Sequence, residues 1–267
     1  LMANQINNYV IEKKIGRGAF GETYIGNHKI TGEKVAIKKS LNNDISLRNE
    51  CNLLHYFKKC KGIPDVRWYG KHDIGNILVM DLLGKPIHSA TFDNINKNIN
   101  YYALQLIETL EFIHKKGFIH RDIKPENILF DLNGNNKIKL IDFGLSKKII
   151  TSDKKHIPFK TNKCIAGTIR YCSINVLMGY ESSRRDDIES LGYNLLFLIN
   201  KKLPWQGIKL GYKDKIIKIK EMKSSVKPSD FKIIPKDNIF KLINYSRRLN
   251  FTEKPIYQYL KTLFCIK

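Results

Sequence analysis

The stretch "HRDIKPEN" (residues 120–127) gathers a histidine, an arginine, two acids, a lysine and an asparagine in eight positions. A solvated loop could carry such a run, so its meaning depends on the residues at fixed distances from it. Asp122 is followed five residues later by Asn127 and 20 residues later by Asp142, at the predicted end of a strand in "KIKLIDFG" (137–144). Asp122 can accept a hydroxyl proton, whereas Asn127 and Asp142 offer the hard oxygen ligands that Mg²⁺ prefers.

Three other side chains of this stretch have expected roles of their own. Lys124 can neutralise charge on a phosphoryl group in transfer. Arg121 carries a guanidinium that is free to order a neighbouring segment. His120 is expected to brace the loop by hydrogen bonds and to take no part in chemistry.

A glycine-rich turn precedes this stretch by about a hundred residues. "IGRGAFG" (15–21) places Gly16, Gly18 and Gly21 between two predicted strands, 9–16 and 21–28. Glycines allow the backbone to approach a phosphate closely, but a tight hairpin requires them as well. A dinucleotide-binding fold would need a helix directly after the glycines, and here a strand follows. The pattern therefore indicates a flap that covers phosphates.

Lys38 and Glu50 form a possible pair. Lys38 ends "VAIK" in the predicted strand 34–39, where a lone lysine is usually a surface residue. Glu50 lies on the predicted helix 44–59, from which it could reach Lys38. Such a pair would hold a cation against anionic oxygens.

The periodicity changes along the chain. The first third alternates as strands do, and the stretch 76–84 is a predicted buried strand that continues into a connector. Apolar residues then recur at helical spacing from Ile99 to Ile113, with Gly117 as the stop signal. A second helix is predicted over 183–200, with its second half buried. This order predicts two lobes joined near residues 81–85.

Composition excludes several classes of protein. Hydrophobic residues make up 42% of the 267 residues, which excludes a disordered or fibrous chain. No stretch approaches the roughly 20 apolar residues of a membrane helix, and no secretory signal is visible. Five scattered cysteines form no CxxC pair and are expected to be free thiols. We therefore expect an intracellular protein, in the cytoplasm or nucleus.

Charge is the strongest compositional signal. There are 47 basic and 25 acidic residues, a net charge of +22. Such a field attracts nucleic acid, anionic lipid or acidic protein substrates, although a solvated basic surface needs no partner at all. The chain has no recognised nucleic-acid-binding motif and no array of stacking aromatics, so no specific nucleic acid is expected.

Taken together, these motifs resemble those of eukaryotic-type protein kinases: GxGxxG, VAIK, a helix-borne Glu, HRDxxxxN and DFG. The resemblance implies an α+β, bilobal protein-kinase fold over residues 1–267. Its β-rich N-lobe would span 9–81 and its mainly helical C-lobe 85–267. "GTIRYCSIN" (167–175) and "LPWQG" (203–207) resemble casein kinase I, in which SIN replaces the APE motif.

The resemblance also implies a Ser/Thr protein kinase that uses ATP and Mg²⁺. Its catalytic residues would be Asp122, Lys124, Lys38 and Glu50, its metal ligands Asn127 and Asp142, and Asp187 would anchor the catalytic loop. The nucleotide would contact Ile15, Gly16, Arg17, Gly18, Ala19, Phe20, Gly21, Glu22, Thr23, Ala36, Lys38, Met80 as gatekeeper, Asp81, Leu83 and Leu129.

Substrate choice is a further implication of the resemblance. Arg170 matches an arginine that favours acidic or already phosphorylated protein substrates, with Lys213 and Lys215 nearby. The family lysine that joins this arginine falls on Ile216, which is a departure. The pattern also implies a monomer that needs no phosphorylation of its activation segment, the stretch from Asp142 to Asn175. The alternatives are a catalytically weak kinase-fold scaffold and a nucleic-acid-binding protein.

Overall fold

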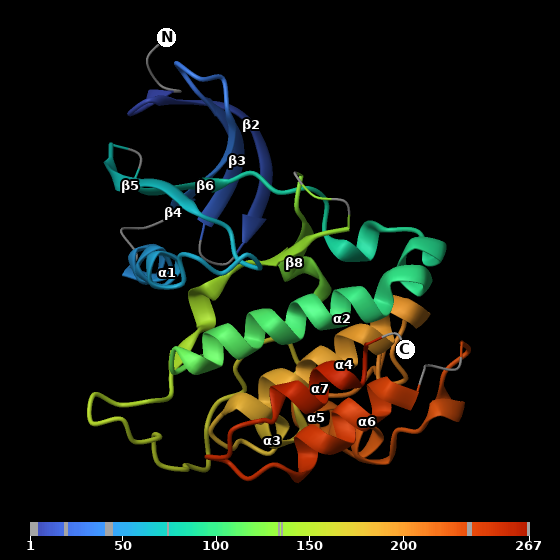
Figure 1. Cartoon of the computed structure of the whole chain (residues 1–267). Coiled ribbons are helices and arrows are strands. Elements are labelled where there is room, and N and C mark those ends of the chain that lie inside the picture. Colours follow the sequence, from blue (N-terminus) through green and yellow to red (C-terminus); the bar gives the residue numbers. More distant parts are fainter. Residues whose placement is uncertain are drawn as a thin grey trace.

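The computed structural model describes residues 5–18, 21–40, 45–73, 75–132, 134, 136–233 and 237–265. A β-sheet with one long helix forms the upper part, and a larger helical part lies below it (Figure 1). The chain crosses between them after the strand that ends at Asp81. The expected bilobal, α+β architecture is therefore confirmed.

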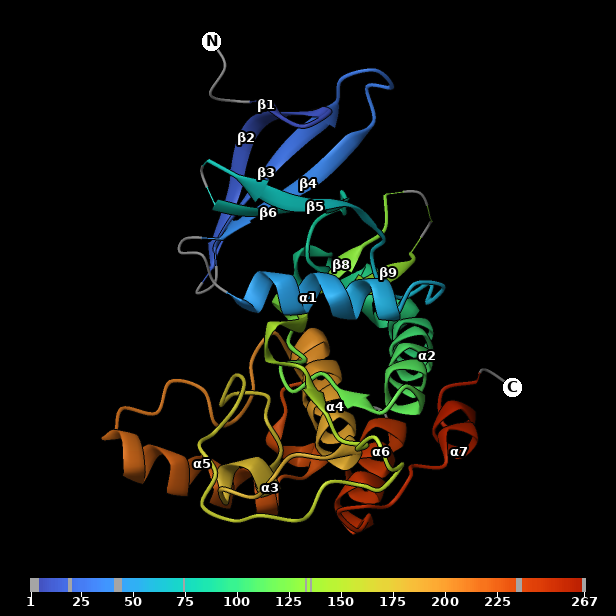
Figure 2. The same ribbon diagram turned by 90° about the vertical axis from the view of Figure 1, so that its left-hand side faces the viewer.

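The upper lobe is built on one antiparallel sheet of six strands in the order β1-β2-β3-β4-β6-β5. The strands are β1 (Gln5–Ile6), β2 (Tyr9–Gly18), β3 (Gly21–His28), β4 (Lys34–Ser40), β5 (Val66–His72) and β6 (Gly75–Asp81). Helix α1 (Ile45–Tyr56) lies between this sheet and the helical lobe (Figure 2). Leu47, Cys51 and Leu54 of this helix and Phe57 after it are buried, as their spacing predicted.

The lower lobe is mainly helical. Its helices are α2 (Phe92–Lys115), α3 (Ile174–Leu177), α4 (Arg184–Asn200), α5 (Tyr212–Ser225), α6 (Asp237–Arg248) and α7 (Tyr257–Thr262). Short strands β7 (Phe118–Ile119), β8 (Ile128–Phe130), β9 (Ile138–Leu140) and β10 (Lys147–Lys148) form two small antiparallel pairs, β10 with β7 and β8 with β9. Short 3₁₀ turns are η1 (Ile87–Ser89), η2 (Pro125–Asn127), η3 (Phe143–Leu145) and η4 (Pro228–Asp230).

One continuous hydrophobic core joins the lobes. It runs from Ala36 and Met80 of the sheet, through α1, to α2 and α4. The Phe143 ring lies at its centre, with ring centroids 5.4 Å from Phe57 and 5.0 Å from His120. The position of α1 is thus coupled by packing to the 120–127 stretch.

One expectation needs correction, and another is confirmed and extended. The strand predicted to end at Asp142 ends at Leu140, because Asp142 adopts a left-handed backbone with φ of +67° that a strand cannot continue. The predicted burial of the second half of α4 is confirmed, and its polar first turn, including Asp186 and Asp187, is buried as well because it is enclosed and hydrogen-bonded.

Two predictions from composition can be compared with the structure. All five cysteines are free thiols, as expected. Among the described residues, none of the helices is long and apolar enough to cross a membrane.

Candidate active site

A buried carboxylate positions the 120–127 stretch. Asp187, near the start of α4, accepts hydrogen bonds from the backbone N–H of His120 at 2.7 Å and of Arg121 at 2.9 Å. The Nε2 atom of His114 from α2 lies 2.9 Å from the same carboxylate. Burial alone would raise the pKa of Asp187, but the hydrogen bonds from His114 and the His120 backbone N–H, together with the field of the two histidines, outweigh burial and lower the pKa. The anchor therefore stays ionised.

Asp187 also holds a strained backbone. Arg121 has a φ of +71°, an unfavourable conformation for a residue with a side chain. His120 braces the loop as expected: its Nδ1 accepts from the N–H of Asp122 at 3.2 Å, so Nε2 can donate to the carbonyl of Ile141 at 3.1 Å. Arg121 donates Nε–H to the carbonyl of Leu145 at 2.6 Å. The loop is thereby tied to the segment that follows Asp142.

The Asp122 carboxylate is held from several sides. Its Oδ2 accepts from Lys124 Nζ at 2.6 Å, and the Asn127 amide donates to its backbone carbonyl at 2.9 Å. Its Oδ1 accepts from the Thr168 hydroxyl at 2.8 Å and the Thr168 N–H at 3.0 Å. Asp122 is only 6% exposed, so these bonds fix one orientation of a nearly buried acid. The arrangement suits a group that must meet a hydroxyl at a defined place.

Gly167 allows this contact between Thr168 and Asp122. Its φ is +87°, and a Cβ atom there would lie 2.2 Å from the carbonyl oxygen of Arg121. Only glycine permits both the conformation and the close approach.

Lys38 joins the two lobes at this site. Its Nζ lies 2.5 Å from the buried carboxylate of Glu50 on α1 and 3.8 Å from Oδ1 of Asp142. The predicted pair of Lys38 and Glu50 is thus formed in the structure. The lysine ammonium stands between an upper-lobe acid and the acid that follows β9.

The oxygens near Lys38 fit a magnesium ion that also binds phosphate. Oδ1 of Asp142 is buried and has no hydrogen-bond partner among the described residues. Asn127 uses its amide nitrogen toward Asp122, which leaves its oxygen available to a cation. The described residues contain no cluster of three or more His, Cys, Asp or Glu that could hold a metal. A two-ligand site suits Mg²⁺, which commonly combines one or two protein ligands with phosphate and water.

The predicted flap is a hairpin in which Gly18 pairs with Gly21. A Cβ atom at Gly16 would meet nothing within 4 Å, so this position has room for a ligand. At Gly21, a Cβ would lie 2.1 Å from the carbonyl oxygen of Lys39, so this glycine is required by sheet packing as well. Ala19 and Phe20 lie outside the described residues.

Other predicted nucleotide contacts lie on the flap and the connection. Ala36 pairs with Met80 across β4 and β6, both nearly buried, and Ile15 is half exposed. The Asp81 carboxylate faces away, bound to Arg67 at 2.9 Å and Lys139 at 3.0 Å, so only its backbone can meet a ligand. The remaining predicted nucleotide contacts are Arg17, Glu22 and Thr23 on β2 and β3, Leu83 on the connection between the lobes and Leu129 on β8.

The predicted substrate anion residues lie on two different parts of the helical lobe, before α3 and on α5. Arg170 is exposed, with its guanidinium 5.7 Å from the centroid of the Tyr171 ring. Lys213 is exposed and Lys215 half-buried on the first turns of α5. Ile216 packs against the core, so its position could not supply an outward charge in this chain.

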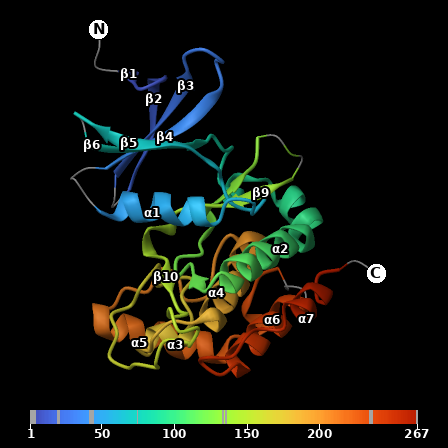
Figure 3. The same ribbon diagram turned by 60° about the vertical axis from the view of Figure 1, so that its left-hand side comes forward.

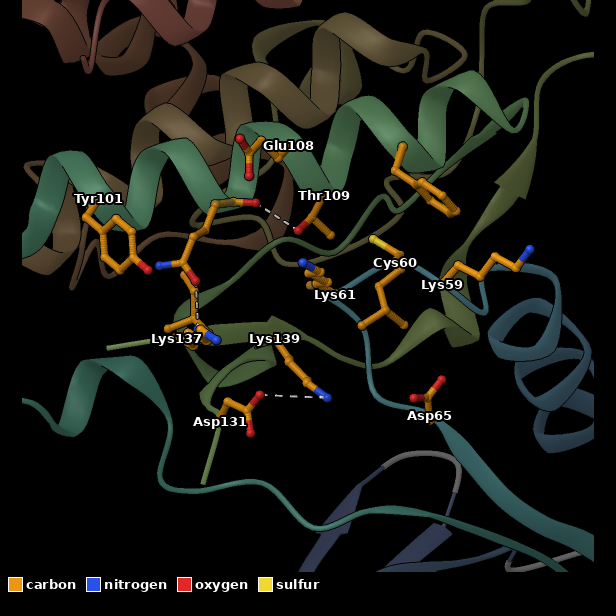
Figure 4. A pocket seen from close by; sticks show the side chains of 15 residues that line it. Lys59, Cys60, Lys61, Asp65, Tyr101, Glu108, Thr109, Asp131, Lys137 and Lys139 are labelled. Atoms are coloured by element: carbon orange, nitrogen blue, oxygen red, sulfur yellow. Dashed lines mark hydrogen bonds and ion pairs between the residues drawn. The ribbon is translucent and has the colours of Figure 1, made fainter. Parts of the chain in front are cut away.

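A cavity of about 590 Å³ borders the Asp81 carboxylate through Lys139, which lines it. It opens between the α1–β5 connection, α2 and β9, where Lys59, Lys61, Lys137 and Lys139 line it (Figure 4). Lys139 lies 3.9 Å from Asp131 there. None of the predicted site residues lines this cavity.

Thr168 is a site residue that the sequence analysis missed. It is the second residue of the quoted motif "GTIRYCSIN", but only the fold brings it to Asp122, 46 positions earlier. The motif was quoted for its resemblance and not for this side chain, and a threonine carries no charge, so its position directly after Gly167 was the only signal.

We predict that Gly167→Ala lowers the free energy of unfolding by about 1–3 kcal/mol, because the positive φ and the contact with Arg121 must both yield. Gly16→Ala is the matched control and should change it by less than about 0.5 kcal/mol, since its Cβ meets open space. Urea denaturation followed by circular dichroism measures both. Equal effects of the two substitutions would show that Gly167 is under no such constraint.

A comparison with known protein families gives an independent result. The family model described as "Protein kinase domain" matches residues 9–265 of the chain.

Proposed function

Since the chain belongs to the protein kinase domain family, we propose that it transfers the γ-phosphoryl group of ATP to serine or threonine hydroxyls of protein substrates. The observation that carries this proposal is the Asp122 carboxylate, held by Lys124 and Thr168 next to the Lys38, Glu50 and Asp142 group. Asn127 links the two groups, since its side-chain amide donates to the Asp122 carbonyl and its own backbone carbonyl accepts from the N–H of Ile141, the residue before Asp142.

The chain's own residues divide the chemistry as follows. Asp122 orients the substrate hydroxyl and accepts its proton, while Lys124 stabilises the charge that develops on the transferring group. Lys38, held by Glu50, positions the phosphates from the upper lobe. Asn127 and Asp142 would hold Mg²⁺, which neutralises phosphate charge when bound. The flap from Gly16 to Thr23 would cover the phosphates.

The replacement Asp122→Asn tests the base. It keeps the size of the side chain but removes the proton acceptor, so kcat should fall roughly 10²–10⁴-fold while the KM for ATP stays nearly unchanged. Asp93→Asn, an exposed change at the start of α2, is the matched control. Steady-state peptide phosphorylation measures both. Near-normal kcat in Asp122→Asn would contradict the assignment.

We propose that no phosphate is needed on the activation segment. Arg121 is already engaged with the carbonyl of Leu145, and Lys147 forms an ion pair with the buried Glu181 at 2.8 Å. Backbone bonds from Ile149 to Gly117 at 2.8 Å fix the segment further. These contacts order the segment with no added anion.

The corresponding prediction is that phosphatase-treated protein keeps its activity. Thr151, Ser152 and Thr161 are the candidate phosphate acceptors in the segment. Their joint replacement by alanine should change kcat/KM by less than about threefold. Activity after treatment, with mass spectrometry to confirm loss of phosphate, measures this. Inactive protein that recovers only on phosphorylation would overturn the proposal.

Substrate preference forms the second part of the proposal. A guanidinium can grip a carboxylate or phosphate with two parallel hydrogen bonds, and Arg170 is exposed two residues after the Thr168 that contacts Asp122. Lys213 and Lys215 on α5 would add charge nearby. The net charge of +22 adds long-range attraction for acidic sequences.

We predict that Arg170→Ala lowers kcat/KM on an acidic or phosphorylated peptide about tenfold and on a neutral peptide much less, because a charge-assisted hydrogen bond is lost only with the anion. Arg48→Ala, on the exposed side of α1, is the control. Equal losses of kcat/KM on both peptides would mean that Arg170 stabilises its own loop and does not recognise the substrate anion.

A further inference from the structure

One fully buried lysine lies outside the residues discussed so far. Lys223, in the last turn of α5, is 0% exposed. Its ammonium donates to the backbone carbonyls of Ile169 at 2.9 Å and Cys172 at 2.6 Å. A buried charge is costly unless it is paired or hydrogen-bonded. Both bonds go to the segment between Thr168 and α3, so the side chain is committed to holding that segment.

Aromatic rings complete the surroundings of this lysine. Its Nζ lies 4.6 Å from the centroid of the Tyr193 ring and 5.3 Å from that of Trp205. The indole N–H of Trp205 donates to the carbonyl of Arg170 at 2.8 Å. Three carbonyls of the same short segment are therefore held by donors from outside it. Burial lowers the pKa of Lys223 to about 8, so the amine is still mainly an ammonium at neutral pH.

A second cluster fixes the lysine itself. Arg247 of α6 donates to the backbone carbonyl of Lys223 at 2.7 Å and to the hydroxyl of Tyr193 at 2.8 Å. Its Nε lies 3.0 Å from the carboxylate of Glu189 on α4. Three helices thus meet behind the segment. Figures 2 and 3 show α3 and α5 side by side at this end of the helical lobe.

The two ends of the held segment are also fixed. At one end Thr168 bonds to Asp122, and at the other the Ser173 hydroxyl donates to the buried Asp186 at 2.5 Å. The residues between them include the exposed Arg170. Loosening the carbonyls would therefore disturb the place where a substrate must lie, while the nucleotide residues of the upper lobe would remain in position.

We propose that Lys223, together with the indole of Trp205, is a positioning residue for protein substrate: it clamps the 169–172 backbone so that Thr168 meets Asp122 and Arg170 faces the incoming peptide. This inference rests on the proposed kinase function. The clamp acts through backbone geometry and touches neither substrate nor ATP.

Lys223→Met tests the clamp, because methionine fills a similar apolar volume against the two rings but lacks the charge and the donors. The KM for peptide should rise about tenfold or more and kcat should fall, since two hydrogen bonds from a charged donor are lost. The KM for ATP should stay within about twofold of wild type. Lys218→Met, an exposed change on the same helix, is the matched control and should leave all three constants unchanged.

Hydrogen exchange of the same variants measures how firmly the 169–172 backbone is held, independently of the kinetic assays. The amides of residues 168–172 should exchange at least about tenfold faster in Lys223→Met than in Lys218→Met, with α2 unchanged, because the local opening becomes easier. If Lys223→Met does not fold, Trp205→Phe removes the bond to Arg170 and should give the same changes in smaller degree. Unchanged exchange in the variant that folds overturns the clamp.

The kinetic outcomes separate this inference from the proposed function. Wild-type protein that transfers no phosphate to any peptide would contradict the proposed function. The exchange data would then still show whether Lys223 holds the 169–172 backbone. Active wild type with equal peptide KM values in Lys223→Met and Lys218→Met would overturn the clamp and leave the function in place. Equal rises in the KM for peptide and for ATP would also overturn it, because they would show a general loss of structure.

Discussion

The carboxylate of Asp187 is the constraint on which the active site depends. It lies buried at the start of α4 and accepts the backbone N–H groups of His120 and Arg121, while His114 approaches it from α2. Arg121 keeps its positive φ because the surrounding hydrogen bonds compensate for the strain. From this fixed turn the chain leads to Asp122, so the orientation of the proposed base is set by a residue that never meets substrate.

Coupling between the lobes follows from two contacts of different kinds. The ion pair between Lys38 and Glu50 is nearly buried, so α1 cannot move away without leaving charges unpaired. The Phe143 ring packs between Phe57 and His120, which ties the end of α1 to the catalytic stretch. A shift of α1 would therefore disturb Lys38, the proposed phosphate-binding lysine, and Asp122, the proposed base, together.

Much of the candidate site could be predicted because its side chains are of particular types and recur at fixed spacings. Lys38, Asp122 and Asp142 each stand in a short characteristic run, "VAIK", "HRDIKPEN" and "DFG", and the order of these runs along the chain carries the information. Thr168 and Lys223 could not be found this way, since their roles come from backbone carbonyls and distant carboxylates that only the fold assembles. The strand boundary at Leu140 was missed because the left-handed turn at Asp142 leaves no mark on local apolar alternation.

The most direct test of the account is to identify the phosphorylated amino acid. The wild-type chain would be incubated with Mg²⁺ and ATP and with a peptide mixture that offers serine, threonine and tyrosine in acidic and neutral surroundings, and the products would be mapped by mass spectrometry. We expect phosphate on serine and threonine, with acidic or already phosphorylated sequences modified first. Phosphate on tyrosine, or no transfer to any peptide, would contradict the account.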